Sequence, residues 1–254
     1  MSPKWKRYAP LTQFGKVLAF DTALNGVSVG YYQRDPYVSD ALYLDTVRGQ
    51  AEHLIPMTKS IVEKHGASLS DVECIITTIG PGSFTGLRLA LSAARSYGMA
   101  LSVPVYGISV LKALALGYSA SINRDEDCHI VVAIETKRSD YYMQIFTADV
   151  QAASDPVTIE AGQVVPWIES HNVTKAHVIG DALGRLQSDL TSAKGQGESL
   201  DLNWHEDQSH FDAKFIASHG ADHIDSYSSD LTPLYLRGAD VSAPKAKARR
   251  ISDV

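Results

Sequence analysis

Residues 74–89 read Cys74-Ile75-Ile76-Thr77-Thr78-Ile79-Gly80-Pro81-Gly82-Ser83-Phe84-Thr85-Gly86-Leu87-Arg88-Leu89, and this stretch decides the fold of the 254-residue chain. Its apolar first part predicts a buried strand, and the apolar residues after the glycines predict the start of a helix. Glycine has no Cβ, so the glycines between them allow positive φ angles and a close backbone approach. Ser83 or Thr85 is expected to cap the helix.

Two interpretations of this turn stay open. A glycine-rich loop at a helix N-terminus can offer backbone amides to a phosphate, but it can also be a rigid corner without a ligand. The phosphate interpretation involves Asp21, Thr22, Gly80, Pro81, Gly82, Ser83, Phe84, Thr85 and Gly86. Asp21 ends an earlier apolar segment, where a carboxylate either orients a metal-bound water near phosphates or caps the turn.

Composition limits the function classes. Hydrophobic residues make up 44% of the chain and charged residues 20%, which is typical of a packed protein rather than a disordered one. Seven basic residues lie in 1–15 and 245–254, and without these ends the body keeps 16 basic and 28 acidic residues. Such a body should not hold a polyanion alone, because phosphate neutralisation dominates nucleic-acid affinity. We expect a soluble, cytoplasmic protein without membrane contact, and if RNA is involved, a partner supplies most of the positive surface.

The hydrophobic periodicity predicts strands and helices in both halves of the chain. Expected strands cover 16–21, 26–32, 38–44, 73–79, 103–108, 129–135, 141–147 and 176–180, and expected helices cover 52–65, 86–101, 109–118, 164–170, 181–190 and 211–220. Both halves open with a hairpin whose first strand ends in an acidic residue and Thr. We predict a flexible leader (1–15), an N-terminal lobe (16–120), a C-terminal lobe (121–243) and a disordered basic tail (244–254).

Other chemistry-bearing residues give weak signals. Cys74 and Cys128 lie in or beside apolar strands and are interpreted as reduced core thiols. His219 and His223 have i, i+4 spacing at a predicted helix end, where solvated histidines are favoured over a metal pair. Ser83 does not lie in the Gly-x-Ser-x-Gly pattern of a nucleophile elbow. No metal site and no catalytic residue is predicted.

Several segments together resemble the bacterial TsaB (YeaZ) family. The strings concerned are Leu18-Ala19-Phe20-Asp21-Thr22-Ala23, Glu52-His53-Leu54-Ile55-Pro56-Met57, Gly80 to Arg88, Pro104 to Ser109, and Pro233-Leu234-Tyr235-Leu236-Arg237. The glycine-rich segment matches the family's G-P-G-S-F-T-G-[VL]-R signature at every position. One departure concerns Glu135-Thr136-Lys137, where the family usually has Asp-Ala-Arg.

The resemblance implies an α/β, actin-like or sugar-kinase-type fold with two ribonuclease-H-like lobes, each a mixed sheet flanked by helices. It also implies a non-catalytic dimerisation subunit for making N6-threonylcarbamoyladenosine in tRNA, beside the anticodon. The expected partners are a catalytic TsaD-type subunit and a TsaE-type ATPase, with a homodimer when the chain is alone. No tightly bound cofactor is expected, and ATP or ADP is expected only at a surface shared with partners.

The catalytic relative allows an internal comparison. It carries the same glycine turn and then a metal-binding His-x-x-x-His on the next helix. In this chain, counting forward from Pro104, those two positions hold Val110 and Leu114, which cannot ligate a metal. This favours a scaffold over an enzyme.

Under the scaffold hypothesis, the helices at 52–65 and 87–101 should form the partner surface. The expected contact residues are Leu54, Met57, Ile61, Leu89, Ala93, Tyr97 and Leu101. An alternative is an ATP-dependent phosphotransferase of the same superfold that uses Asp21 and the 80–86 loop. A third hypothesis, a peptidase, has no nucleophile or metal constellation to support it.

Overall fold

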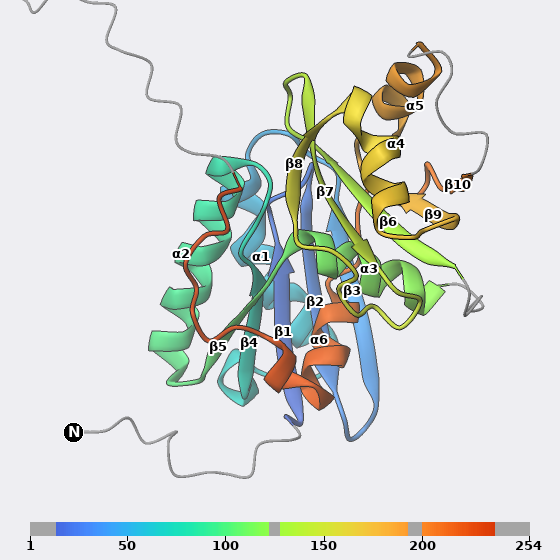
Figure 1. Ribbon diagram of the computed structural model, residues 1–254. Helices are drawn as coiled ribbons and strands as arrows, with labels where there is room; N and C mark the ends of the chain where they lie inside the picture. Colours follow the sequence, from blue (N-terminus) through green and yellow to red (C-terminus); the bar gives the residue numbers. More distant parts are fainter. Residues whose placement is uncertain (1–13, 122–127, 193–199, 237–254) are drawn as a thin grey trace, which may run out of the picture.

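The computed structural model describes residues 14–121, 128–192 and 200–236, and these form two lobes that are each built on a five-stranded sheet (Figure 1). In the first sheet the strand order is β3-β2-β1-β4-β5. Its strands are β1 (Lys16–Asp21), β2 (Val27–Gln33), β3 (Val38–Leu44), β4 (Cys74–Thr78) and β5 (Val105–Ile108). The first three pair antiparallel, whereas β4 pairs parallel to both β1 and β5.

The second sheet repeats this topology. Its strands are β6 (His129–Glu135), β7 (Asp140–Phe146), β8 (Val157–Glu160), β9 (Lys175–Ile179) and β10 (Asp201–Trp204), in the order β10-β9-β6-β7-β8. The meander β6-β7-β8 is antiparallel, and β9 pairs parallel to β6 and β10. When the strands of this sheet are counted from the β8 edge, their order and directions match those of the first sheet counted from the β3 edge. The predicted fold class of two lobes with mixed sheets is therefore confirmed, and the lobes are structural repeats.

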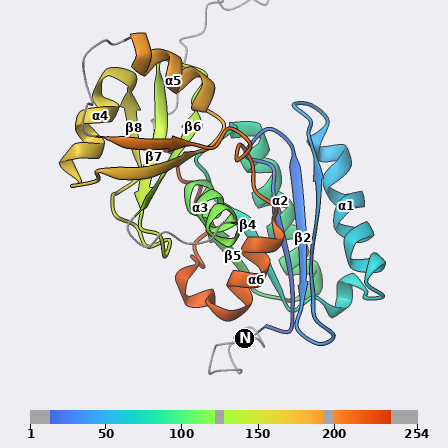
Figure 2. The same ribbon diagram turned by 90° about the vertical axis from the view of Figure 1, so that its right-hand side faces the viewer.

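Helices cover both faces of the first sheet. One face packs against α1 (Gln50–Lys64) and α2 (Phe84–Leu101), and these share a core with inward side chains such as Leu18 and Tyr31. The opposite face packs against α3 (Val110–Ser121) and α6 (Lys214–Asp222). Figure 2 shows α3 and α6 between the first sheet and the second lobe. The second lobe carries α4 (Ala161–Ser170) and α5 (Leu183–Ser192) on its sheet.

A shared core joins the lobes. Side chains of α3 pack in one cluster with Val17 and Ile76 of the first sheet and with Ile130 and Val132 of the second. Because α3 is apolar on nearly every side, it is a core helix rather than a surface helix, and nine of its residues are buried. The lobes are thus connected by continuous hydrophobic packing.

The chain returns to the first lobe near its C-terminal end. Helix α6 lies across β1 and β2, where Gly30 lets the backbone of Ala213 approach so closely that an added Cβ would lie 2.2 Å from its carbonyl carbon. Helix α6 therefore packs on the first sheet, whereas the sequence division assigns its residues to the C-terminal lobe. The short helix η3 (Ile224–Ser226) follows α6, and Ser228 then forms an isolated bridge with Gly107 of β5.

The sequence missed the short strands β8 and β10 and the 3-10 helix η2 (Leu69–Asp71). The predicted disordered tail and the residues 1–13 of the predicted leader lie outside the described residues. Phe14 and Gly15 are described, and their amides donate to Ala221 O and to Glu73 Oε2. Both cysteines are buried and unbridged, as predicted. No helix in the described part of the chain combines the length and the apolar character needed to cross a bilayer.

Candidate functional site: the turn after β4 and the helix layer

The turn between β4 and α2 packs directly on the turn after β1. Gly80 has a φ of 105°, a left-handed conformation that favours glycine. Gly86 has no such φ, but an added Cβ there would lie 1.8 Å from the carbonyl oxygen of Thr22. The glycine at position 86 is therefore required by backbone contact between the two turns.

Hydrogen bonds within the chain connect this turn to the turn after β1 and cap the helix. The amide of Ser83 donates to Ala23 O at 2.7 Å, and the hydroxyl of Thr22 donates to Gly86 O at 2.6 Å. Ser83 is the N-cap of α2, as the sequence predicts, and its Oγ accepts from the amide of Gly86. These contacts fit the interpretation of a rigid corner.

Asp21 is held in the same corner. It is 3% exposed, and its Oδ1 accepts from the hydroxyl of Thr78 at 2.5 Å and from the amide of Ala23 at 3.1 Å. Its Oδ2 accepts from the amide of Leu24 at 3.4 Å. Burial raises the pKa of the Asp21 carboxyl, while these hydrogen bonds act in the opposite direction. Of the two interpretations of Asp21, the geometry matches the cap of the turn.

The C-terminal segment closes over this turn. The amide of Leu234 donates to Ile79 O at 2.6 Å, and the ring of Tyr235 lies 6.0 Å from the ring of Phe84. The guanidinium of Arg88 lies 3.9 Å from the centroid of the Phe84 ring. The glycine-rich turn and the C-terminal segment around Tyr235 are about 150 residues apart in sequence. Neither segment alone therefore predicts that the two are in contact.

The first turns of α3 contain the two positions that hold metal ligands in the catalytic relative. Val110 is fully buried and Leu114 is 2% exposed, and both belong to the shared core of the lobes. Across the described ranges, no group of three or more His, Cys, Asp or Glu side chains is placed to hold a metal ion. Positions 110 and 114 thus contribute hydrocarbon packing.

The helix layer of α1 and α2 contains the seven predicted contact residues, and three of them are unavailable to a partner. Leu54 and Ile61 are fully buried and Ala93 is 9% exposed, because all three face the sheet or the neighbouring helix. The other four are half-buried at the edge of the same core: Met57, Leu89, Tyr97 and Leu101. The sequence reasoning assigned the inner apolar face of each helix to the partner.

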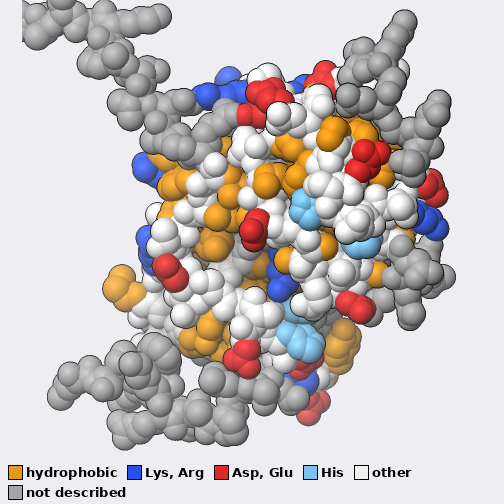
Figure 3. Space-filling view, viewed as in Figure 1, with side chains coloured by type: hydrophobic (Ala, Val, Ile, Leu, Met, Phe, Trp, Pro, Cys, Tyr) orange, Lys and Arg blue, Asp and Glu red, His pale blue; other side chains and the backbone are white. Residues whose placement is uncertain are grey.

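The outward face of the layer carries other apolar side chains. Met99 is 81% exposed, Phe84 is 52% exposed and Ile55 is 51% exposed. Figure 3 shows hydrophobic side chains at the surface in the region of α2. The contact between α1 and α2 is itself fixed, since the hydroxyls of Thr58 and Tyr97 are 2.5 Å apart. The exposed residues therefore stand on a rigid two-helix platform.

In the second lobe, the strand-end acid Glu135 is paired within the chain. Arg185 of α5 donates to both carboxylate oxygens, at 2.7 and 2.8 Å, and its guanidinium lies 3.9 Å from the centroid of the Tyr141 ring. The amide of Glu135 donates to Asp181 Oδ1 at 2.8 Å. Burial is the main cause that raises the pKa of Asp181 to about 6. The segment that departs from the family pattern is thus a structural network.

Comparison with known proteins identifies the family. The family model described as "TsaD: tRNA N6-adenosine threonylcarbamoyltransferase" matches residues 45–179, more than half of the chain. The tRNA threonylcarbamoyladenosine biosynthesis protein TsaB of Escherichia coli is 28% identical over 134 residues, which are 53% of this chain and 56% of that protein. The chain belongs to the TsaB/YeaZ branch of the TsaD family.

Other members of the family extend the comparison. An uncharacterised protein of Mycobacterium tuberculosis is 36% identical over 104 residues, 40% of this chain and 49% of that protein. The chain thus spans about half the length of the curated relatives it matches first. YeaZ from Pseudomonas aeruginosa has the same fold, with a TM-score of 0.69 at 21% identity over 88% of this chain and 100% of that chain.

Proposed function

We propose that the chain is a non-catalytic subunit in the formation of N6-threonylcarbamoyladenosine in tRNA, and that it acts by binding a TsaD-type catalytic subunit. The pathway is supported by the names of the TsaB relatives and by the description of the matching family model. The observation that carries the non-catalytic role is the packing of Val110 and Leu114, because hydrocarbon side chains occupy the core where the catalytic relative has its ligands.

The proposed partner surface is the outward face of α1 and α2. Its exposed members are Ile55, Phe84 and Met99, which lie on helices fixed to the sheet by a shared core. Burial of one such side chain contributes about 1.5–3 kcal/mol to association, so a few of them can hold a specific partner. The same face can form a homodimer when the partner is absent.

The proposal also includes a TsaE-type ATPase, tRNA and a nucleotide. A TsaE-type ATPase completes the assembly, and tRNA is contacted mainly by other subunits, because the body of this chain carries 16 basic and 28 acidic residues. ATP or ADP is bound only at a surface shared with the partners.

The phosphotransferase alternative has no observation in its favour. Asp21 is 3% exposed and accepts hydrogen bonds from Thr78, Ala23 and Leu24, so its carboxylate serves the turn rather than an open site. Magnesium-dependent ATP binding by the isolated chain is the result that would reopen this alternative.

Reconstitution tests the proposed function. The chain is mixed with TsaD-type and TsaE-type subunits, tRNA, ATP and the threonylcarbamoyl-adenylate donor, and the modified nucleoside is quantified. We expect modification that requires all the protein components and none from this chain alone. Turnover by the isolated chain would contradict the proposal.

A substitution tests the surface. Met99→Asp places a charge on the outward face of α2, where the side chain is 81% exposed, so the fold should be retained. We expect association to weaken at least about tenfold, which is equivalent to about 1.4 kcal/mol. The matched control is Gln163→Asp, which adds the same charge to an exposed position on α4 of the other lobe. Equal association of the two variants in sedimentation experiments would place the interface elsewhere.

A further inference from the structure

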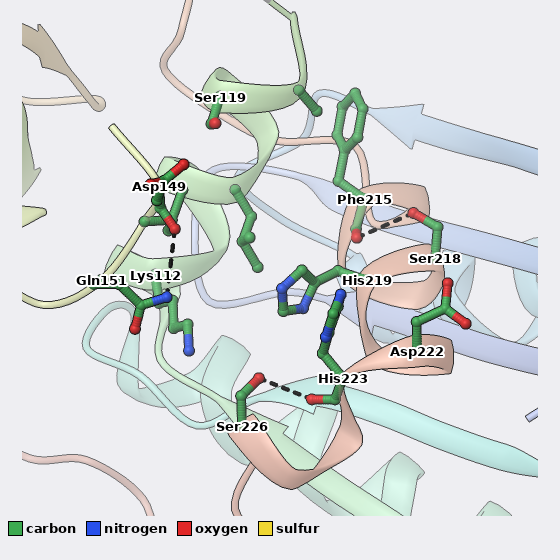
Figure 4. Close-up of a pocket in the computed structure, with 13 residues that line it drawn as sticks. Lys112, Ser119, Asp149, Gln151, Phe215, Ser218, His219, Asp222, His223 and Ser226 are labelled. Carbon is green, nitrogen blue, oxygen red and sulfur yellow. Dashed lines mark hydrogen bonds between the residues drawn. The ribbon is translucent and has the colours of Figure 1, made fainter. Parts of the chain in front are cut away.

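A pocket of about 570 Å³ lies between α3, α6 and the loop after β7 (Figure 4). None of its lining residues belongs to the 80–86 turn, to the outward face of α1 and α2, or to the Glu135 network. Its walls differ in character, since Leu116 and Phe215 are apolar, whereas Lys112, His219 and His223 are basic. The volume is within the usual range for a small-molecule site.

Lys112 is the unusual residue of α3. The surrounding positions of this helix, from Val110 to Ser119, are buried apolar or small residues. The Lys112 side chain is half-buried, and within the described chain its ammonium group has neither a hydrogen bond nor an ion pair. Burial lowers the pKa of Lys112. A desolvated cation without a partner, placed in a pocket, points to an anionic ligand.

His219 adds a second polar group, which lies beside a tyrosine hydroxyl. The hydroxyl oxygen of Tyr227 lies 3.1 Å from Ile216 O, which can only accept a hydrogen bond, and 3.0 Å from His219 Nδ1. With the Tyr227 proton donated to Ile216 O, Nδ1 carries a proton and donates it to Tyr227, and the lone pair of the neutral ring lies on Nε2. Figure 4 shows the His219 ring pointing from α6 into the pocket. The prediction of a solvated surface histidine is thus wrong for His219 and correct for the exposed His223.

The two neighbouring basic groups disfavour a proton on His219. The rings of His219 and His223 lie 4.7 Å apart. Burial is the main cause that lowers the pKa of His219 to about 4, His223 and Lys112 act in the same direction, and Asp222 acts against them. Two carboxylates also line the pocket: Asp222 is bound by Arg34 at 2.6 Å, and Asp149 is an exposed residue of the loop after β7.

We propose that this pocket binds a small organic anion, with its phosphate or carboxylate group between Lys112 and the His219–His223 pair. The apolar or aromatic part of the ligand lies against Leu116 and Phe215. On binding, His219 accepts a proton at Nε2 and donates a hydrogen bond to the anion. Binding is therefore accompanied by proton uptake, and affinity rises as the pH falls from 7 towards 5.

The experiment titrates the full chain with two probes, phenyl phosphate and benzoate, which carry the two possible head groups on the same aromatic body. The histidine Hε1 signals are followed by NMR, and affinities are measured by calorimetry at pH 7 and pH 5.5. We expect saturable shifts of the His219 and His223 signals with at least one probe, tighter binding at pH 5.5, and an upward shift of the His219 titration in the complex. The preferred probe identifies the head group.

Two variants and one control connect binding to the site. Lys112→Met keeps the length of the side chain and removes its charge, and it should weaken binding at least about tenfold. His223→Gln changes an exposed side chain and should weaken binding severalfold while the protein stays folded. The control Lys59→Met removes an exposed lysine from α1 and should bind like the parent chain. The proposal is overturned if neither probe saturates at millimolar concentration, or if all three variants bind like the parent.

Discussion

Replacing Gly86 with alanine should destabilise the protein strongly, although alanine is the better helix former. Gly86 lies in the first turn of α2. An added Cβ would lie 1.8 Å from the carbonyl oxygen of Thr22, a contact with backbone that no side-chain rotation can relieve. The corner formed by the turns after β1 and β4 would have to open.

The expected loss of stability in Gly86→Ala is the sum of three contributions to the free energy of unfolding. Overpacking of a core costs about 1–3 kcal/mol, and the upper end applies because the clash is with backbone. Opening the corner weakens the buried hydrogen bond from the Thr22 hydroxyl to Gly86 O, which costs about 1 kcal/mol more. The higher helix propensity of alanine returns about 1 kcal/mol. The expected net loss is about 3 kcal/mol, or roughly 6–12 °C in Tm for a chain of this size.

Chemical and thermal unfolding of the parent and two variants provide the assay. Gly162 is the matched control, since it lies in the first turn of α4 and an added Cβ there would meet no atom within 4 Å. Gly162→Ala should stabilise the protein by up to about 1 kcal/mol. If the glycine served only the approach of a phosphate, Gly86→Ala would behave like Gly162→Ala and keep or raise the stability. A loss of less than about 0.5 kcal/mol in Gly86→Ala would therefore refute the packing argument.

Three further predictions concern charged groups. Arg185→Met removes the paired hydrogen bonds to Glu135 and the contact with the Tyr141 ring, and urea unfolding should show a loss of about 1–3 kcal/mol. The folded-state pKa of Asp181 is raised from 3.8 to about 6. The contribution of this carboxyl to the free energy of unfolding is therefore fully present below pH 3.8 and is lost as the pH rises through 6. Asp181→Asn should therefore gain stability relative to the parent across this window, by up to about 3 kcal/mol. The folded-state pKa of His219 is lowered from 6.5 to about 4, so stability is lost as the pH falls from 6.5 to 4, and His219→Gln should flatten this part of a stability–pH profile.

Local sequence patterns were sufficient for most strands and helices. The apolar run of β1, the alternation in β2 and the glycine-rich turn before α2 each specify an element from neighbouring residues alone, and the structure places these elements as predicted. The strands β8 and β10 were missed because each has only four residues and two of the four are polar, whereas β5, of equal length, is an apolar run. The return of α6 to the first sheet depends on Gly30 and Ala213, which are far apart in sequence.

The partner surface shows the limit of amphipathic patterns. A stripe of apolar residues predicts that one face of a helix is covered, but it does not say whether a sheet or another protein covers it. Leu54 and Ile61 have the spacing of such a stripe and face the sheet. Met99 is a single apolar residue on the polar face of α2. The hydrophobic periodicity therefore did not indicate it as a contact residue. Exposure, which depends on the packed structure, distinguishes the two kinds of apolar residue.

The two strand-end acids support a common interpretation of both lobes. Asp21 accepts hydrogen bonds from Thr78 and from backbone amides of its own turn, whereas Glu135 is paired with Arg185 of its own lobe. In each lobe the carboxylate that ends the first strand is therefore bonded within the repeat that carries it. Both strand-end carboxylates thus take part in structural corners, and under the proposed function the chemistry on tRNA depends on groups supplied by a partner subunit. The inference turns on Asp21: a Thr78→Val variant that keeps its fold but gains magnesium-dependent ATP binding would show that the corner hides a functional carboxylate.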